Sequence, residues 1–129
     1  MITNKHVLIT GGGTGIGRAI ALLFADDGAK VTITGRRSKM LEEVADKSVN
    51  IAAFPMDVSN EKEVISVISQ TVSQFGPIQV CVANAGIAEG KKLQNTDLEF
   101  WQRIMGTNLD GTFLTIRESM KSLRVFESL

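Results

Sequence analysis

A glycine-rich segment near the start of the chain has the residue types and spacing needed to hold phosphate groups. It reads Thr10-Gly11-Gly12-Gly13-Thr14-Gly15-Ile16-Gly17 and lies between an apolar run and a segment with helical periodicity. Glycines in such a loop allow a tight turn, let the backbone approach a pyrophosphate, and let the helix pack closely on the strand. The free N–H groups and the positive end of the helix then receive the phosphates. We therefore predict a dinucleotide-binding loop rather than a flexible turn without a ligand. The predicted contact residues are Gly11, Thr14, Gly15, Ile16 and Gly17.

The residues after the next apolar run indicate which dinucleotide is preferred. An NAD site usually has an Asp or Glu about 20 residues beyond the glycine loop, where it binds the ribose 2′-hydroxyl. This chain has Thr34-Gly35-Arg36-Arg37 at that place, without a carboxylate. An acidic side chain would repel a 2′-phosphate, whereas an arginine can bind it with paired hydrogen bonds. We predict NADP(H) in preference to NAD(H), with Arg36 as the main contact. The alternative is a solvated basic turn that includes Lys39.

The elements that must position these residues alternate between strand and helix. Short apolar or β-branched runs, each followed by glycine, proline or polar residues, predict four strands. They cover residues 6–10, 30–34, 51–54 and 78–83. Segments with helical spacing separate these runs, and this alternation is typical of an α/β fold with a parallel sheet.

Helical spacing and capping residues predict four helices. In the first, an apolar face is formed by Ile16, Ile20, Leu23 and Phe24. The second covers residues 39–46. The third begins after Asn60, which has the capping pattern with Glu63, and ends at residues 76–77. The last runs from about Asp97 to Arg124, and residues 124–129 do not have the pattern of a further strand.

Composition limits the class of protein. The chain has 129 residues, the size of one domain, and its 14 basic and 14 acidic residues cancel. This balance gives no sign of a nucleic-acid or anionic-membrane partner. Cys81 is the single cysteine, so no internal disulfide can form. No apolar run approaches the ~20 residues of a membrane helix, and the first residues do not resemble a signal peptide. We expect a cytoplasmic protein, and we predict no metal site.

Three further segments, taken with the glycine loop, resemble one protein family. They are Asp57-Val58 after the third strand, Asn84-Ala85-Gly86-Ile87 after the fourth, and Asn108-Leu109-Asp110-Gly111 in the last helix. In this order, and with the spacing T-G-x-x-x-G-x-G, they resemble the short-chain dehydrogenases/reductases from Lys5 to about Leu123. One departure is Ala83, which replaces the first asparagine of the family's N-N-A-G segment. The resemblance implies a doubly wound parallel sheet of the Rossmann type.

The resemblance also implies a role for each segment. Asp57 and Val58 would face the adenine ring. Asn84, Ala85 and Gly86 would line the ribose on the nicotinamide side. Asn108 would hold a water molecule in a proton relay. Each polar residue has an alternative without a ligand: turn capping for Asp57, a hydrogen bond within its own loop for Asn84, and a structural hydrogen bond for Asn108.

The activity that the resemblance implies is hydride transfer between a nicotinamide and a carbonyl or alcohol. In the family this chemistry needs a serine and a Tyr-x-x-x-Lys motif beyond the last helix. The chain contains no tyrosine and ends at Leu129, so only the Asn108 position is present among the catalytic residues. We expect residues 1–129 to be a single, incomplete NAD(P)-binding domain, truncated after about four strands and the following helix. We expect no turnover by this chain alone, and a small carbonyl or alcohol substrate only if the missing residues are supplied. An interrupted or frame-shifted gene would explain this pattern.

Two other readings remain open. The chain could be a non-catalytic dinucleotide-binding or dimerising module, forming a homo-oligomer through the Asp97–Arg124 helix or the edge of the fourth strand. In the family, the corresponding helix commonly contributes to a dimer interface. The chain could also be an inactive gene remnant.

Overall fold

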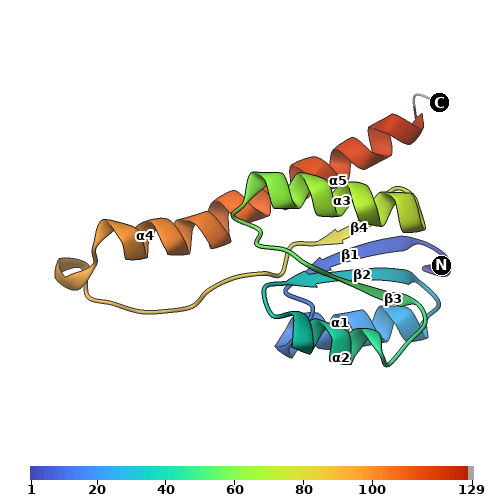
Figure 1. Ribbon diagram of the computed structural model, residues 1–129, viewed down its shortest axis with the longest axis horizontal. Coiled ribbons are helices and arrows are strands. Elements are labelled where there is room, and N and C mark those ends of the chain that lie inside the picture. The colour runs from blue at the N-terminus through green and yellow to red at the C-terminus, as the bar shows by residue number, and fades with distance from the viewer. Residues whose placement is uncertain (128–129) are drawn as a thin grey trace.

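The computed structural model describes residues 1–127, together with the side chains of residues 1–123, and these residues contain a four-stranded parallel sheet. The strands are β1 (His6–Thr10), β2 (Lys30–Gly35), β3 (Ile51–Pro55) and β4 (Val80–Val82), in the order β3-β2-β1-β4 (Figure 1). This order is the one expected for the first four strands of a doubly wound sheet. The predicted fold class is therefore confirmed.

Helices cover both faces of the sheet. On one face lie α1 (Gly15–Asp26) and α2 (Ser38–Ala45), and on the other lie α3 (Glu61–Phe75) and α5 (Gly111–Glu127) (Figure 1). Alternate residues of a strand point to opposite faces. Accordingly, Val7 and Ile9 belong to the core beneath α1 and α2, whereas Leu8 belongs to the core beneath α3 and α5. Because β1 is buried on both faces, all five of its residues are buried, and its three central residues, Val7, Leu8 and Ile9, are apolar.

The fourth strand is shorter than the sequence pattern indicates. Prediction placed a strand over residues 78–83, but β4 contains only three residues. At its start, the Ile78 N–H donates to the Ser122 hydroxyl of α5 (3.0 Å) instead of to a neighbouring strand. At its end, the Asn84 N–H bonds back to the Val82 carbonyl oxygen in a turn (2.9 Å). Within residues 1–127, β4 pairs only with β1.

The apolar face predicted for the first helix is only partly correct. Ile16 and Leu23 are 73% and 65% exposed, while Ala21 is fully buried. The cause is the close approach of α1 to the sheet: a Cβ atom on Gly17 would lie 2.1 Å from the Gly11 carbonyl oxygen. Only small side chains fit at such a contact, so the larger apolar residues of α1 lie beside it or face outward.

The predicted last helix is divided into three parts. It consists of α4 (Leu98–Met105), a π-helical turn η2 (Gly106–Asp110) and α5. It begins near Asp97 as predicted, and the Asp97 carboxylate caps it by accepting a hydrogen bond from the Phe100 N–H (2.8 Å). The segment before α4 includes a short 3₁₀ turn, η1 (Leu93–Asn95). The segment that follows Gly86, together with α4, projects from the body, and we call residues 87–105 the arm (Figure 1). Helix α5 extends to Glu127, so residues 124–127 are not a strand, and residues 128–129 lie outside the described part of the chain.

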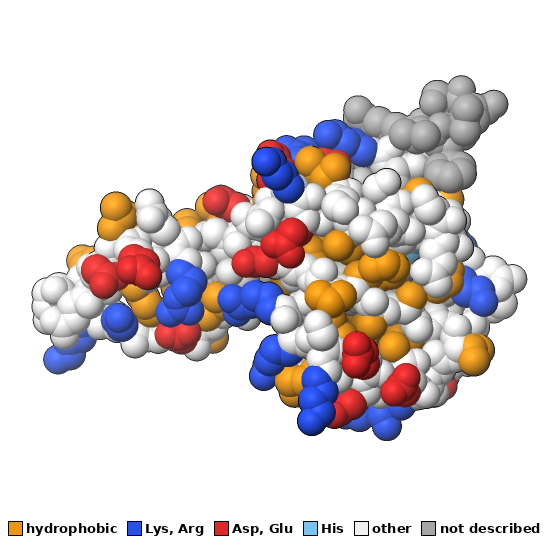
Figure 2. Space-filling model, viewed as in Figure 1, with side chains coloured by type: hydrophobic (Ala, Val, Ile, Leu, Met, Phe, Trp, Pro, Cys, Tyr) orange, Lys and Arg blue, Asp and Glu red, His pale blue; other side chains and the backbone are white. Residues whose placement is uncertain are grey.

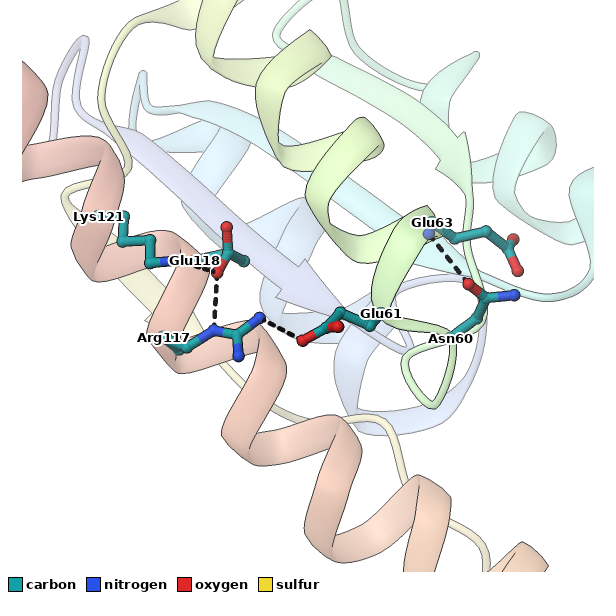
Figure 3. Close-up of polar contacts among 6 residues, drawn as sticks. All are labelled: Asn60, Glu61, Glu63, Arg117, Glu118 and Lys121. Atoms are coloured by element: carbon teal, nitrogen blue, oxygen red, sulfur yellow. Dashed lines mark hydrogen bonds and ion pairs between the residues drawn. The ribbon is translucent and has the colours of Figure 1, made fainter.

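One ion pair joins α5 to the start of α3, and two more lie within α5 (Figure 3). Arg117 contacts Glu61 of α3 and its neighbour Glu118, both at 2.8 Å, and Lys121 contacts Glu118 at 3.1 Å. The first turn of α3 is capped as predicted, since the Asn60 side chain accepts a hydrogen bond from the Glu63 N–H (3.1 Å). The Arg117–Glu61 pair thus links α5 to the first turn of α3.

In the part of the chain that the structure describes, no helix has the length and apolar character needed to span a membrane. The same residues contain no cluster of three or more His, Cys, Asp or Glu side chains suited to a metal ion.

Candidate functional site

A cleft of about 460 Å³ lies at the carboxyl ends of the parallel strands. Segments that follow β1, β2, β3 and β4 all contribute to its walls, as expected where the strand order reverses in a doubly wound sheet. Seven of the predicted cofactor-binding residues line it together: Gly11, Thr14, Arg36, Asp57, Val58, Ala85 and Gly86.

The glycine loop forms the wall of the cleft beside β1. Gly11 and Gly15 have φ angles of +66° and +55°, a backbone region that favours glycine. The Gly12 N–H donates to the Thr34 carbonyl oxygen (3.1 Å), which ties the loop to β2. Because Gly15, Ile16 and Gly17 are the first residues of α1, their N–H groups lack acceptors within the helix. No atom lies within 4 Å of a Cβ placed on Gly15, so this part of the loop is open to a ligand.

Two hydrogen bonds join the loop after β4 to the end of β1 and the glycine loop. The Asn84 side-chain amide donates to the Gly11 carbonyl oxygen (3.2 Å), and the Ala85 N–H donates to the Thr10 hydroxyl (3.0 Å). Asn84 is not among the residues that line the cleft. Its side chain therefore bonds to the glycine loop and not, as the alternative expected, within its own loop, while Ala85 and Gly86 line the cleft.

Asn108 lies in the π-helical turn, and both polar atoms of its side-chain amide bond to the backbone of the same residue, Ile87. Its Oδ1 accepts from the Ile87 N–H (2.7 Å), and its Nδ2 donates to the Ile87 carbonyl oxygen (2.8 Å). Both contacts join the arm to the helix, which is the structural alternative stated for this residue. Asn108 also lines a smaller neighbouring cavity of about 370 Å³ with Ile87 and Thr112. Its role in a proton relay stays a prediction.

The part of the cleft formed by the segments after β2 and β3 combines two arginine side chains with a carboxylate. Arg36 and Arg37 follow β2, are exposed, and make no ion pair among the described residues. Asp57 accepts hydrogen bonds from the N–H (2.9 Å) and hydroxyl (2.7 Å) of Ser59, so it caps its own turn while lining the cleft. Val58 is buried against α5, where a Cβ atom on Gly111 would lie 2.5 Å from its side chain. The position of Val58 thus depends on that glycine.

Sequence reasoning missed several residues of the cleft wall. Met40 and Leu41 come from α2, where helical spacing suggested packing alone. Thr107 comes from the π-helical turn and directly precedes Asn108. Its position beside a predicted site residue was the one feature of the sequence that could have indicated a place in the cleft. Thr34 also lines the cleft, and its buried hydroxyl has no hydrogen-bond partner among the residues that the structure describes. These residues are brought together only by the packing of α2 and α5 on the sheet.

A parallel sheet in this order, with a glycine loop and an open cleft at its carboxyl end, defines a doubly wound α/β domain of the Rossmann type. The family model described as short chain dehydrogenase matches residues 5–127. The chain therefore belongs to the short-chain dehydrogenase family.

Characterised relatives and solved structures agree with this assignment. The chain is 37% identical over 127 residues to an NADP-dependent (R)-specific alcohol dehydrogenase from Lentilactobacillus kefiri, covering 95% of this chain and 50% of the relative. It is 38% identical over 120 residues to a 3-oxoacyl-[acyl-carrier-protein] reductase from Staphylococcus epidermidis, covering 89% of this chain and 49% of the relative.

Among solved structures, a 3-ketoacyl-(acyl-carrier-protein) reductase from Brucella melitensis complexed with NADH is similar with a TM-score of 0.91. It is 32% identical, and the match covers 97% of this chain and 52% of that one. The chain thus spans about half the length of the relatives it matches.

Proposed function

We propose that this chain binds NADP(H) in the cleft and is the cofactor-binding part of an oxidoreductase that transfers hydride between a nicotinamide and a carbonyl or alcohol. The observation that carries the proposal is that one cleft is lined by residues of the glycine loop, by two arginines without an ion pair among the described residues, and by the Asp57-Val58 pair. Each group suits a different part of a dinucleotide phosphate. When bound, the cofactor would supply the hydride, and the chain's own residues would bind and orient it.

The pyrophosphate is assigned to the glycine loop. The free N–H groups at the start of α1 and the positive end of the helix dipole favour phosphate oxygens there. Gly11, Gly15, Ile16 and Gly17 form this part of the proposed site, with Thr14 as the residue that precedes the helix. Asp57 and Val58, which follow β3, are assigned to the adenine ring. Ala85 and Gly86, which follow β4, are assigned to the ribose on the nicotinamide side.

The preference for NADP(H) is assigned to Arg36. Its exposed guanidinium lines the cleft just after β2, and no acidic side chain among the described residues pairs with it. A 2′-phosphate can therefore take two charge-assisted hydrogen bonds there. Relatives differ in this respect, since one is named NADP-dependent and a solved structure is complexed with NADH. The proposal for this chain rests on its own arginine.

Calorimetric titration with NADP⁺ and with NAD⁺ tests the proposal. We expect saturable binding that favours NADP⁺. Arg36→Ala should weaken NADP⁺ binding about tenfold to a hundredfold, the effect of losing a charged hydrogen bond of about 1.5–3 kcal/mol, and should leave NAD⁺ binding unchanged. Lys5→Ala removes an exposed positive charge just before β1, at the opposite end of the strands, and serves as the control. Equal affinity for both dinucleotides, or no effect of Arg36→Ala, would contradict the NADP(H) preference.

A second candidate function is self-association, with or without catalysis. Helices α4 and α5 and the turn between them expose a row of large apolar side chains. They are Leu98, Trp101, Leu109, Phe113, Ile116 and Met120. Large apolar patches on a protein surface commonly mark interaction sites. A second copy of this chain is the partner we propose for this face, and the edge of β4 is an additional candidate contact.

A further inference from the structure

The segment that leaves the cleft for the arm has little burial or regular structure to hold it. Gly86 lines the cleft, and Ile87 and Ala88 line the neighbouring cavity, so this segment forms a wall shared by both spaces. Residues 88–95 are all exposed, and residues 83–92 belong to no helix or strand. The hydrophobic effect and backbone pairing therefore contribute little to its position. Specific side-chain contacts must fix it instead.

Three contacts join this segment to α4 and the π-helical turn η2, which run beside it. Nearest the body is the pair of hydrogen bonds between Ile87 and Asn108. Farther out, the Arg103 guanidinium donates two hydrogen bonds to the Glu89 carboxylate, at 2.9 and 3.0 Å. Beyond that, the Lys91 ammonium lies 4.4 Å from the centre of the Phe100 ring. Figure 2 shows side chains of both charges gathered on the arm.

The Glu89–Arg103 contact is the strongest of the outer two. Two parallel N–H···O bonds between a guanidinium and a carboxylate fix both distance and orientation. The Arg103 hydrogen bond lowers the pKa of Glu89 below its ordinary value, so the carboxylate is charged at neutral pH. The two side chains are 43% and 49% exposed, so salt weakens their attraction.

We propose that the Glu89–Arg103 pair positions the Gly86–Ile87 wall of the cleft and thereby controls affinity for the nicotinamide half of the bound dinucleotide. This inference rests on the proposed function, because it assigns the β4 side of the cleft to the nicotinamide. The adenosine half is assigned to Arg36 and Asp57 at the other side, away from the arm. Loss of the pair should therefore weaken binding of the whole dinucleotide and leave binding of its adenosine half unchanged.

The test compares two ligands by calorimetry: NADP⁺, and adenosine 2′,5′-bisphosphate, which lacks the nicotinamide half. We expect Glu89→Gln and Arg103→Gln each to weaken NADP⁺ binding about twofold to fivefold, the scale of one exposed ion pair. The double variant should lose no more than either single variant, because one contact is removed in all three. Glu99→Gln makes the same charge change one helical turn from Arg103 and is the control.

A second measurement follows the wall directly in the protein without ligand. Hydrogen exchange at the Ile87 N–H, which is bonded to Asn108, should be faster in Glu89→Gln than in the wild type or in Glu99→Gln. Unchanged exchange, or an unchanged ratio of NADP⁺ to bisphosphate affinity, would overturn the inference and leave the proposed function intact. A wild-type chain that binds neither ligand would overturn both.

Discussion

At the scale of single residues, the buried histidine shows how a polar side chain is accommodated in the core. His6 is fully buried at the start of β1, with its ring edge against Phe75. Its Nδ1 lies 2.8 Å from the Gly76 carbonyl oxygen, and its Nε2 lies 2.8 Å from the Thr32 hydroxyl. A neutral ring satisfies both contacts when Nδ1 carries the proton and Nε2 accepts from the hydroxyl. His6 therefore joins the end of α3 to β2 and has a structural role.

This arrangement predicts that the protein loses stability in mild acid. Burial lowers the pKa of His6 below its ordinary value of 6.5, although the hydrogen bond to Gly76 raises it. Below about pH 6.5 the unfolded chain binds a proton that the folded chain does not, so stability falls until the pH reaches the folded-state pKa. Urea unfolding followed by circular dichroism from pH 7.5 to 5.5 should show this loss.

His6 is the single histidine, so His6→Gln is a direct control for this slope. The variant should be less stable at pH 7.5, because buried hydrogen bonds are lost, but its stability should change much less between pH 7.5 and 5.5. An equal slope in both proteins would show that other groups are responsible.

At the scale of the elements, the last helix has two faces with different tasks. One face packs on the body: Leu114 belongs to the core beneath α3 and α5, the Ser122 hydroxyl accepts from the Ile78 N–H, and Arg117 reaches Glu61 of α3. The other face exposes the apolar row from Leu98 to Met120. The π-helical turn between α4 and α5 inserts one extra residue per turn, and it places Thr107 in the cleft wall and Asn108 against Ile87.

The exposed row predicts association through α4 and α5. Light scattering over a range of protein concentrations should show a dimer that dissociates on dilution. Phe113→Asp should shift the equilibrium to the monomer, since a buried carboxylate in an apolar interface is costly. Leu23→Asp places the same charge on the exposed side of α1 and should have no effect. A monomer at all concentrations would contradict the proposal.

At the scale of the whole molecule, the 129 residues combine the candidate cofactor cleft with the absence of one residue type, tyrosine. The carboxyl ends of four strands meet at one edge, and the cleft there has groups suited to phosphate and purine. Reduction of a carbonyl also needs a proton donor next to the nicotinamide. In the family that donor is a tyrosine, and the 129 residues contain none.

We therefore expect that these 129 residues bind the cofactor without turning it over. The measurement is NADPH oxidation in the presence of a panel of ketones, with Gly15→Ala as a control in which the glycine loop is strained by its positive φ. Steady oxidation by the wild type that is lost in Gly15→Ala would contradict this expectation.

Sequence alone determined much of this protein. Strand and helix alternation, the Asn60 cap, and the order of the family motifs predicted the fold class and the family, because these signals are local and depend on periodicity and backbone chemistry. The cleft-lining positions of Gly11, Arg36 and Asp57 followed from the rule that loops after parallel strands meet at one edge.

Only the tertiary structure decided where other side chains face and what they contact. The outward position of Ile16 depends on the close contact at Gly17, and the place of Thr107 in the cleft depends on how α5 packs. Likewise, the pairing of Glu89 with Arg103 joins residues from an irregular segment and a helix. Such contacts depend on the mutual packing of distant elements, for which a single sequence carries no local periodic signal.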